Sequence, residues 1–416
     1  MGETMTGPQL ANSFLDRRVL AILRFCCAVI FGTALFGQAQ TLTVLHSFTG
    51  GVDGYEPYAG VTLDQQGRIY GTTIQGGNHG DGVVFRLVRE GEGWAFSPIY
   101  SFGSQDHDGN NPVSRVVFGP GGLLYGTTSG GGAEGYGTVF SLQPPPTACK
   151  AVLCPWVETI LYSFTGGADG ASPLYGDLAF DHAGNIYGTA SYAGSSNNGV
   201  VFKLTRSGSG WTESVIWNFT GHGDGGNPVS GVIFDNAGNL YGTSSAGGSN
   251  YSGAVYELSP TQSGWSETTL YSFTGETGAG AGGLIMDAYG NVFGITGGLD
   301  GGSSTAFELT PQNGSLSFTL LQNFGFEYIG AVAAPTFDSH GSLYGPLPTI
   351  NDDLTGEIFK LTPSGNQWIY SSFYQFDGST AGLPLGAVTF DASGNMYGTG
   401  LGGGSDYDGV VWEITP

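Results

Sequence analysis

Basic residues are scarce in this chain of 416 residues: Lys and Arg number 11 against 34 Asp and Glu, for a formal net charge of −23. A surface of this sign repels nucleic-acid phosphates and anionic lipid headgroups, so we expect neutral or cationic partners and no nucleic acid. Histidine is also sparse, with 6 residues and no His-x-x-x-His or Cys–His spacing. Neither a nucleophilic triad nor a metallohydrolase site is therefore indicated.

Cysteine is rare as well, with only 4 residues. Two of them lie in the N-terminal segment, and Cys149 and Cys154 lie in a Pro-containing insertion. In an exported protein two cysteines this close in sequence favour a local disulfide. A metal site is not indicated there, because no His or second Cys pair accompanies them.

Long hydrophobic runs are confined to the N-terminus. Two arginines precede an apolar run from Val19 to Phe36, and small residues end it at Ala39. The longest uninterrupted part has 12 residues, too few to span a bilayer core of ~30 Å. The pattern predicts a signal peptide over residues 1–39, with an uncleaved anchor as the alternative. Its removal leaves 8 basic and 32 acidic residues, no membrane span and no recognisable C-terminal anchor. We expect a secreted, periplasmic or cell-surface protein.

Glycine and aromatic residues are abundant: 76 Gly, and 13% Phe, Trp and Tyr. This composition is typical of a turn-rich all-β protein with short strands. The sequence also repeats. A strand ending in Phe recurs seven times at intervals of 51 to 62 residues, at Phe48, Phe102, Phe164, Phe219, Phe273, Phe324 and Phe376. Seven such units use all of residues 40–416, so we expect a single domain there.

Each unit contains four strand-like runs. In the third unit these are 178–181, 185–189, 199–204 and 211–219. The first two are joined by Asp-x-x-Gly, as at Asp181–Gly184, and the motif recurs in five other units. Asp can accept hydrogen bonds from nearby amides, and Gly can take a positive φ. We interpret this Asp as a turn residue, because one enzyme does not need six copies of its acid.

Four antiparallel strands per unit predict a seven-bladed β-propeller of four-stranded blades. The chain begins at 41–48 with a fourth strand and ends at 409–415 with a third. The N-terminal strand is therefore expected to complete the last blade and close the ring, which leaves no open sheet edge. A linear β-solenoid would have no reason to start and stop within a unit.

The recurring motifs carry a family resemblance. They are Tyr-Ser-Phe-Thr-Gly, Phe-Asp-x-x-Gly-Asn-x-Tyr-Gly-Thr and Gly-Val-Val-Phe-x-Leu. In these residues the chain resembles the Gloeo-Verruco (GloVer) tandem-repeat family of exported bacterial proteins. The resemblance covers essentially the whole of residues 40–416. It implies a secreted or surface repeat protein and assigns no biochemical function.

The longer loops, between second and third strands and between blades, are expected to lie on one face of the ring. Propellers generally bind ligands on a loop face or at the channel mouth. The candidate ligand-binding residues there are Asp53, Tyr55, Asp108, Tyr136, Asp169, Asp224, Tyr251, Asp377 and Tyr407. The alternative is that each Asp-Gly only makes a tight turn.

Two further candidates come from local patterns. Asp106, Asp108, Asp406 and Asp408 resemble the start of calcium loops but lack the downstream bidentate Glu. Calcium bound by these loop carboxylates is one hypothesis, and no cofactor is expected to be required. Near the axis, three blades have Gly four residues before the turn Asp, whereas Arg115 and Asp177 take that place in two adjacent blades. They are expected to form an ion pair or to face a ligand.

Three functional hypotheses remain open. The first is a monomeric, non-catalytic propeller that binds a glycan or a protein, since tyrosine rings and short polar groups suit neutral sugars. The second is a carbohydrate-active enzyme with two loop carboxylates as acid and base, although no pair stands out. The third is a purely structural surface protein.

Overall fold

The computed structural model describes Met1 and residues 40–145, 156–208, 210–297, 303–312, 315–325, 333–349 and 354–416. The expected signal peptide and the expected disulfide between Cys149 and Cys154 lie outside the described residues. None of the helices in the described part of the chain is long and apolar enough to cross a membrane.

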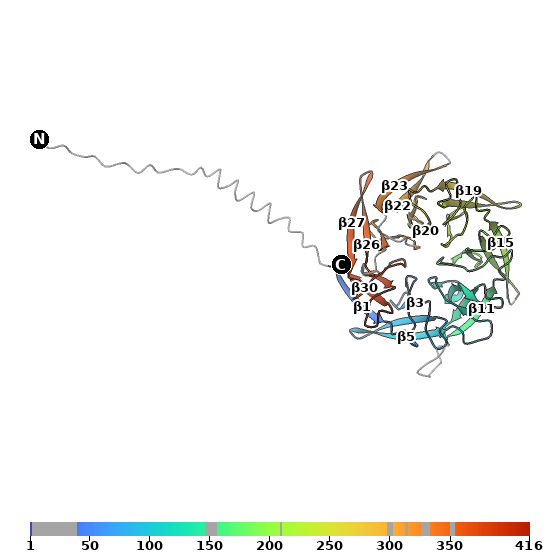
Figure 1. The fold of residues 1–416 in the computed structure, drawn as a ribbon, viewed down its shortest axis with the longest axis horizontal. Helices are drawn as coiled ribbons and strands as arrows, with labels where there is room; N and C mark the ends of the chain where they lie inside the picture. Colours follow the sequence, from blue (N-terminus) through green and yellow to red (C-terminus); the bar gives the residue numbers. More distant parts are fainter. Residues whose placement is uncertain are drawn as a thin grey trace. The chain divides into compact units, whose positions relative to one another are not determined.

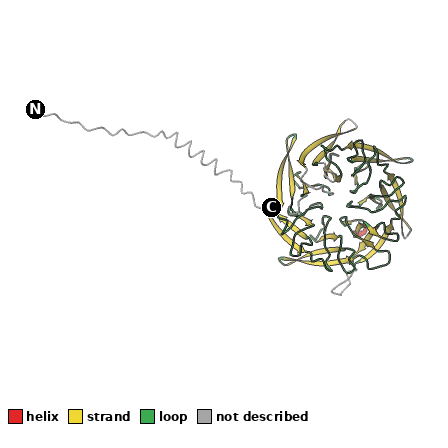
Figure 2. Cartoon of the chain, in the orientation of Figure 1, coloured by secondary structure: helices red, strands yellow, loops and turns green. Residues whose placement is uncertain are grey.

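Seven four-stranded antiparallel sheets, all within the compact unit Thr41–Thr415, stand around one axis (Figure 1). In six sheets the first strand lies nearest the axis and the later strands follow outward, whereas in the seventh the N-terminal strand is the outermost. Strands and loops account for this unit apart from one helical turn, η1 (Pro120–Gly122), among the described residues (Figure 2). This confirms the predicted all-β, seven-bladed propeller.

The blades consist of the following strands. Blade 1 has β2 (Thr62–Leu63), β3 (Ile69–Thr73), β4 (Val83–Glu90) and β5 (Gly93–Ser101); blade 2 has β7 (Val117–Phe118), β8 (Leu124–Thr128), β10 (Thr138–Gln143) and β11 (Val157–Ser163). Blade 3 has β12 (Ala179–Phe180), β13 (Ile186–Ala190), β14 (Val200–Ser207) and β15 (Gly210–Asn218); blade 4 has β16 (Ile233–Phe234), β17 (Leu240–Ser244), β18 (Ala254–Thr261) and β19 (Gly264–Ser272). Blade 5 has β20 (Ala281–Met286), β21 (Val292–Thr296), β22 (Ser304–Gln312) and β23 (Ser315–Gly325); blade 6 has β24 (Thr336–Phe337), β25 (Leu343–Pro348), β26 (Gly356–Ser364) and β27 (Gln367–Phe376). Blade 7 has β28 (Thr389–Phe390), β29 (Met396–Gly400), β30 (Val410–Thr415) and the N-terminal strand β1 (Thr41–Ser47). A short pair outside the blades joins β6 (Gly109–Asn110) to β9 (Gly130–Gly131).

The ring closes as predicted. Strand β1 pairs antiparallel with β30, from Thr41 opposite Thr415 to Ser47 opposite Val410. The first and last strands of the ring therefore share one sheet, and the N-terminal strand gives β30 a partner on its outer side. Closure removes an exposed edge that another chain could pair with.

The hydrophobic cores lie between blades. Each core combines residues of two neighbouring blades, and the repeated Phe that follows a fourth strand reaches into the next blade. Phe164 packs edge-on against Phe202 of β14, with ring centroids 5.2 Å apart. An equivalent contact with an aromatic ring of the next third strand, edge-on or tilted and with centroids 4.9 to 5.4 Å apart, is made by Phe48, Phe102, Phe219, Phe273, Phe324 and Phe376. The residue that revealed the repeat is thus the one that joins successive blades.

The turn between the first and second strands depends on its Asp. In blade 3, Oδ1 of Asp181 accepts the backbone N–H groups of Ala183 and Asn185, both at 2.9 Å. Its Oδ2 accepts the Asn185 amide at 2.6 Å and the Tyr187 hydroxyl at 3.1 Å. Burial alone would raise the pKa of Asp181, but these hydrogen bonds outweigh it and lower the pKa. The repeated Asp is a turn residue, as predicted. Blade 2 has no Asp here and uses η1 instead.

The Gly-Thr that follows the Tyr serves packing. A side chain at Gly188 would put its Cβ 2.6 Å from Phe202 Cζ, so only Gly lets the core ring lie there. Thr189 donates its hydroxyl across to the next blade, to the Ser230 carbonyl at 2.7 Å. Equivalent inter-blade bonds are made by Thr72, Thr243 and Thr399. In the motif Tyr-Gly-Thr, the Tyr thus bonds the turn Asp, the Gly leaves room for the core ring, and the Thr bonds the next blade.

Candidate functional site

Two kinds of loop lie together at one end of the ring. The second-to-third loops of blades 1, 2, 3, 4 and 7 span residues 74–82, 129–137, 191–199, 245–253 and 401–409. They pair with the inter-blade loops through isolated bridges such as Tyr55–Gln75. The following inter-blade loop also bonds to the second-to-third loop, because the Asn111 backbone N–H donates to the Asp81 carbonyl at 2.9 Å. The prediction that both kinds of loop share a face is confirmed, and we name this surface the long-loop face.

The aspartates of the inter-blade loops accept hydrogen bonds from residues of their own loops or of the strand before. The Asp169 carboxylate accepts the Thr165 backbone N–H at 2.7 Å, the Thr165 hydroxyl at 2.5 Å and the Tyr162 hydroxyl at 2.9 Å. Burial alone would raise the pKa of Asp169, but these bonds outweigh it and lower the pKa. Comparable contacts within their own turns are made by Asp53, Asp108, Asp224 and Asp377. These carboxylates are engaged by the fold, which leaves the aromatic rings as the open groups of this face.

The tyrosines differ in exposure. Tyr55 is half-buried and donates its hydroxyl to Gln75 Oε1 at 2.5 Å. Tyr136, Tyr251 and Tyr407 are 45%, 74% and 62% exposed. Tyr192, 52% exposed in the equivalent loop of blade 3, was not among the predicted residues. Its place in a second-to-third loop is the signal that identifies it.

Tyr251 and Tyr407 also have an unfavourable backbone conformation. Their φ angles are 58° and 63°, in the left-handed region. The same loop position is held in other blades by Gly80, Gly135 and Asn197, which suit that region. A bulky side chain there costs about 1–2 kcal/mol, and an exposed ring regains little of it through packing. Strained residues of this kind cluster at ligand-binding and active sites.

The calcium candidates lie apart from one another. Asp106 and Asp406 are exposed, with Asp406 accepting a hydrogen bond from the Ser405 hydroxyl at 2.8 Å. Asp108 is buried in its turn, and Asp408 is partly buried. Among the described residues, no group of three or more His, Cys, Asp or Glu side chains gathers as metal ligands would.

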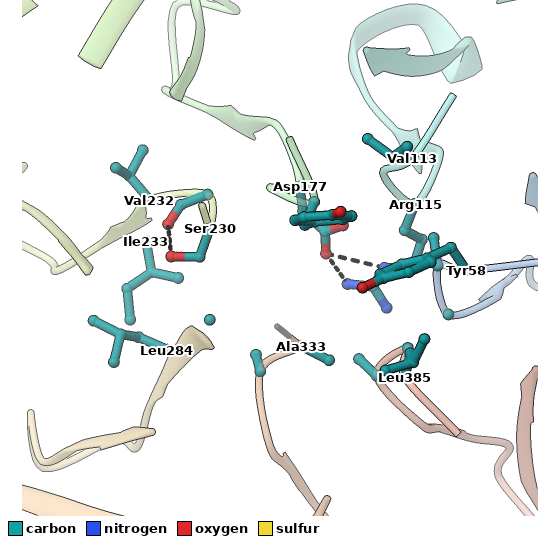
Figure 3. A pocket seen from close by; sticks show the side chains of 18 residues that line it. Tyr58, Val113, Arg115, Asp177, Ser230, Val232, Ile233, Leu284, Ala333 and Leu385 are labelled. Carbon is teal, nitrogen blue, oxygen red and sulfur yellow. Dashed lines mark hydrogen bonds and ion pairs between the residues drawn. The ribbon is translucent and has the colours of Figure 1, made fainter. Parts of the chain in front are cut away.

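The second candidate region is the axial channel, which is hollow between the innermost segments of the blades. Arg115 of blade 2 and Asp177 of blade 3 form an ion pair here, with Arg115 Nε 3.0 Å from Asp177 Oδ2 (Figure 3). Asp177 raises the pKa of Arg115, and burial opposes it less strongly, so the guanidinium stays charged. The structure thus brings together the two channel residues that the sequence singled out.

Two tyrosines near this ion pair were missed. Tyr58 precedes β2 and Tyr175 precedes β12, and both line the hollow with Arg115 and Asp177. Their rings stack with centroids 4.8 Å apart. Each lies six residues before the turn Asp of its blade, whereas Arg115 and Asp177 were identified by comparing the blades four residues before that turn. The same comparison made two residues earlier would have identified both tyrosines.

Comparisons with known proteins agree with this architecture. The family model described as the Gloeobacter/Verrucomicrobia repeat matches residues 28–154 and 153–345. No protein with a curated description is similar enough in sequence to count as a relative. Among solved structures, the chain is similar to a catalytically inactive virginiamycin B lyase from Staphylococcus aureus, solved with quinupristin. Identity is 15%, the TM-score is 0.55, and the match covers 91% of this chain and 100% of that one.

A second similar structure is PorZ, a surface component of the type-IX secretion system of Porphyromonas gingivalis. Here the identity is 16% and the TM-score 0.52, with 89% of this chain and 48% of that chain covered. At such identities the likeness shows the fold alone, because one propeller scaffold supports many unrelated functions.

Proposed function

This chain belongs to the Gloeobacter/Verrucomicrobia repeat family. We propose that it is an exported, monomeric, non-catalytic propeller that binds a neutral glycan on its long-loop face. The observation that carries this proposal is the pair Tyr251 and Tyr407. Both are largely exposed, and both have a strained backbone that Gly or Asn would relieve. An unpacked ring kept at a strained position is best explained by a ligand that contacts it.

The surroundings of these rings suit a sugar. Tyr251 stands between Asn250 and Ser252, and Tyr407 between Asp406 and Asp408. An aromatic face packs against the apolar face of a pyranose, while short polar side chains bond its hydroxyls. The excess of acidic over basic residues disfavours an acidic sugar. Tyr136 and Tyr192 present rings on the same face, which favours an extended ligand over a small one.

The export part of the proposal rests on residues 1–39, whose apolar run and small terminal residues have the form of a signal peptide. A carbohydrate-active enzyme is the less supported alternative. The inter-blade carboxylates are bound by their own turns, and the pKa values of Asp169 and Asp377 are lowered, with hydrogen bonds outweighing burial. A general acid needs a raised pKa, so Asp169 and Asp377 are unsuited to that role.

The test is a glycan-array screen of the purified chain, with and without calcium, followed by titration of any glycan found. We expect saturable binding that Tyr251→Ala or Tyr407→Ala weakens by about tenfold or more. Tyr289→Ala is the matched control, because Tyr289 is 87% exposed in the first-to-second turn of blade 5, at the opposite end of the strands.

Three outcomes would contradict the proposal. A blank array in both conditions would point to a protein partner or a structural role. Cleavage of the bound glycan would make the protein an enzyme. Equal loss of binding in the Tyr289→Ala control would place the ligand elsewhere. Loss of binding on removal of calcium would show that the loop carboxylates hold the ion.

A further inference from the structure

The axial channel contains a hollow to which all seven blades contribute. It has a volume of about 580 Å³ when space open to solvent is included. The hollow lies along the axis rather than at the loop tips, so it is separate from the tyrosines that carry the proposed function.

The ion pair in this hollow is only partly satisfied. Arg115 Nε and Nη2 both bond the same oxygen of Asp177, Oδ2. A fork-to-fork pair would use both carboxylate oxygens. Among the described residues, Arg115 Nη1 and Asp177 Oδ1 have no hydrogen-bond partner. One positive donor and one negative acceptor therefore stand side by side at the hollow, with the two side chains 27% and 35% exposed.

The tyrosine beside this pair is held there by an insertion. Between its Pro and the turn Asp, blade 3 has one residue more than blades 1, 4 and 7. The extra residue is taken up in a tight turn, in which Gly176 N–H bonds the Leu174 carbonyl at 2.5 Å. Tyr175 within that turn has φ = 51°, a strained conformation for a bulky residue. Burial, and Tyr175 next to it, raise the pKa of Tyr58, so that ring stays a neutral phenol.

Apolar side chains make up most of the rest of the lining. Ile233 and Leu284 lie on the side away from Arg115, next to Ser230, whereas Leu385 lies beside Tyr58 (Figure 3). The two charged side chains come from blades 2 and 3, and most of the other side chains that line the hollow are apolar. The hollow therefore combines one ion pair of zero net charge with a mainly apolar wall.

We propose that the axial hollow binds a small zwitterion with an apolar body, of the α-amino-acid class. Its carboxylate would bond the open edge of Arg115, its ammonium would bond Asp177 Oδ1, and its side chain would lie against Leu284 and Leu385. A zwitterion pairs both charges at once. An anion alone would compete with Asp177 for Arg115, and a cation alone would compete with Arg115 for Asp177, leaving a partly buried charge unpaired.

The test is calorimetric titration of the full chain with apolar L-amino acids, L-leucine and L-phenylalanine first. Leucinamide lacks the negative charge, N-acetyl-leucine lacks the positive charge, and N-acetyl-leucinamide lacks both. We expect saturable binding of the amino acid and at least about tenfold weaker binding of all three derivatives. Asp177→Asn should reduce the affinity for the amino acid by a similar factor.

A second variant separates binding from folding. Tyr175→Asn relieves the left-handed backbone but removes the ring that stacks on Tyr58 beside Arg115. It should bind the amino acid more weakly, while the relieved strain offsets the lost stacking in thermal stability. Tyr289→Ala, in the exposed first-to-second turn of blade 5, should bind it as the unchanged protein does. The proposal is overturned if no protein L-amino acid binds up to about 10 mM. It is also overturned if N-acetyl-leucinamide binds as well as leucine, which would assign the hollow to neutral amphipathic molecules. Neither result bears on glycan binding at the long-loop face.

Discussion

Tyr58 and Tyr175 stack with ring centroids 4.8 Å apart and an angle of 22° between their planes, although they belong to blades 1 and 3. The intervening blade 2 contributes Arg115 to the same hollow. Seven copies of one unit would by themselves give the same residue at each of these positions. The polar groups are instead gathered on three adjacent blades, so the asymmetry of this ring is concentrated at its axis.

The backbone strain at the exposed tyrosines predicts that relieving it raises stability and weakens ligand binding. Tyr251→Asn should raise the free energy of unfolding by about 1 kcal/mol, because Asn tolerates the left-handed conformation. The same variant should lose ligand on the long-loop face. Urea unfolding measures the gain. Tyr192→Asn is the control, since Tyr192 is exposed in an equivalent loop without a positive φ, and a gain of equal size there would contradict the strain argument.

The innermost segments of blades 3 and 4 approach so closely that substitution of one glycine should destabilise the fold. A Cβ at Gly231 would stand 2.2 Å from the Asp177 carbonyl oxygen, a backbone atom that cannot swing away. Gly231→Ala should therefore lower the free energy of unfolding by about 2–4 kcal/mol. Gly223→Ala should change it little, because nothing lies within 4 Å of a Cβ there. Thermal unfolding compares the two, and similar losses in both variants would contradict the argument from crowding.

The hydrogen bond between blades 7 and 1 predicts a loss of stability when it is removed. Thr399 donates its hydroxyl to the Ala59 carbonyl at 2.8 Å and is 1% exposed. Thr399→Val keeps the shape but leaves that carbonyl unpaired, which should cost about 1–2 kcal/mol in chemical unfolding. Thr205→Val, at an exposed position of β14, should cost less than about 0.5 kcal/mol. Equal effects would mean that the inter-blade bond adds nothing to closure.

A glutamate on an outer strand predicts a pH dependence. Burial first, and the nearby Asp108 second, raise the pKa of Glu158 in β11 from its ordinary value of 4.5 to about 8. The folded state therefore favours the protonated acid. Its stability is complete below pH 4.5 and falls as the pH rises toward 8, because the unfolded chain releases the proton earlier.

The variant that tests this is Glu158→Gln, which imitates the protonated acid. It should match the unchanged protein near pH 5 and be more stable by about 1 kcal/mol near pH 9, a figure kept small because part of the side chain is in water. Unfolding midpoints across this range provide the measurement. Glu92→Gln, in the exposed turn between β4 and β5, is the matched control. A constant difference at every pH would exclude Glu158 as the titrating group.

The repeat determined the architecture because it appears in local motifs. Asp181 and its equivalents make turns with residues two to six positions away, and Gly188 clears space for a ring on the adjoining strand. Phe164 meets the next blade at a fixed distance along the chain. Contacts set by neighbouring residues repeat whenever the sequence repeats, so the strands, the blade count and the closure by β1 could all be predicted.

The candidate sites were only partly predictable. The long-loop face and the pairing of Arg115 with Asp177 followed from the repeat, because equivalent positions lie at equivalent places in the ring. The engagement of Asp169 by Thr165 and Tyr162 did not, since the same carboxylate in a loop can face solvent or its own backbone. Nor did the strain at Tyr251 and Tyr407, which depends on a backbone angle.

The sequence by itself thus determined that this protein is an acidic, seven-bladed propeller, because strand period, turn chemistry and repeat length are local properties of the chain. Only the tertiary structure decided which side chains are free to act. The stacking of Tyr58 on Tyr175 joins residues more than a hundred positions apart. Closing the ring is what brings the seven inner segments to one axis, and the hollow they enclose exists only there.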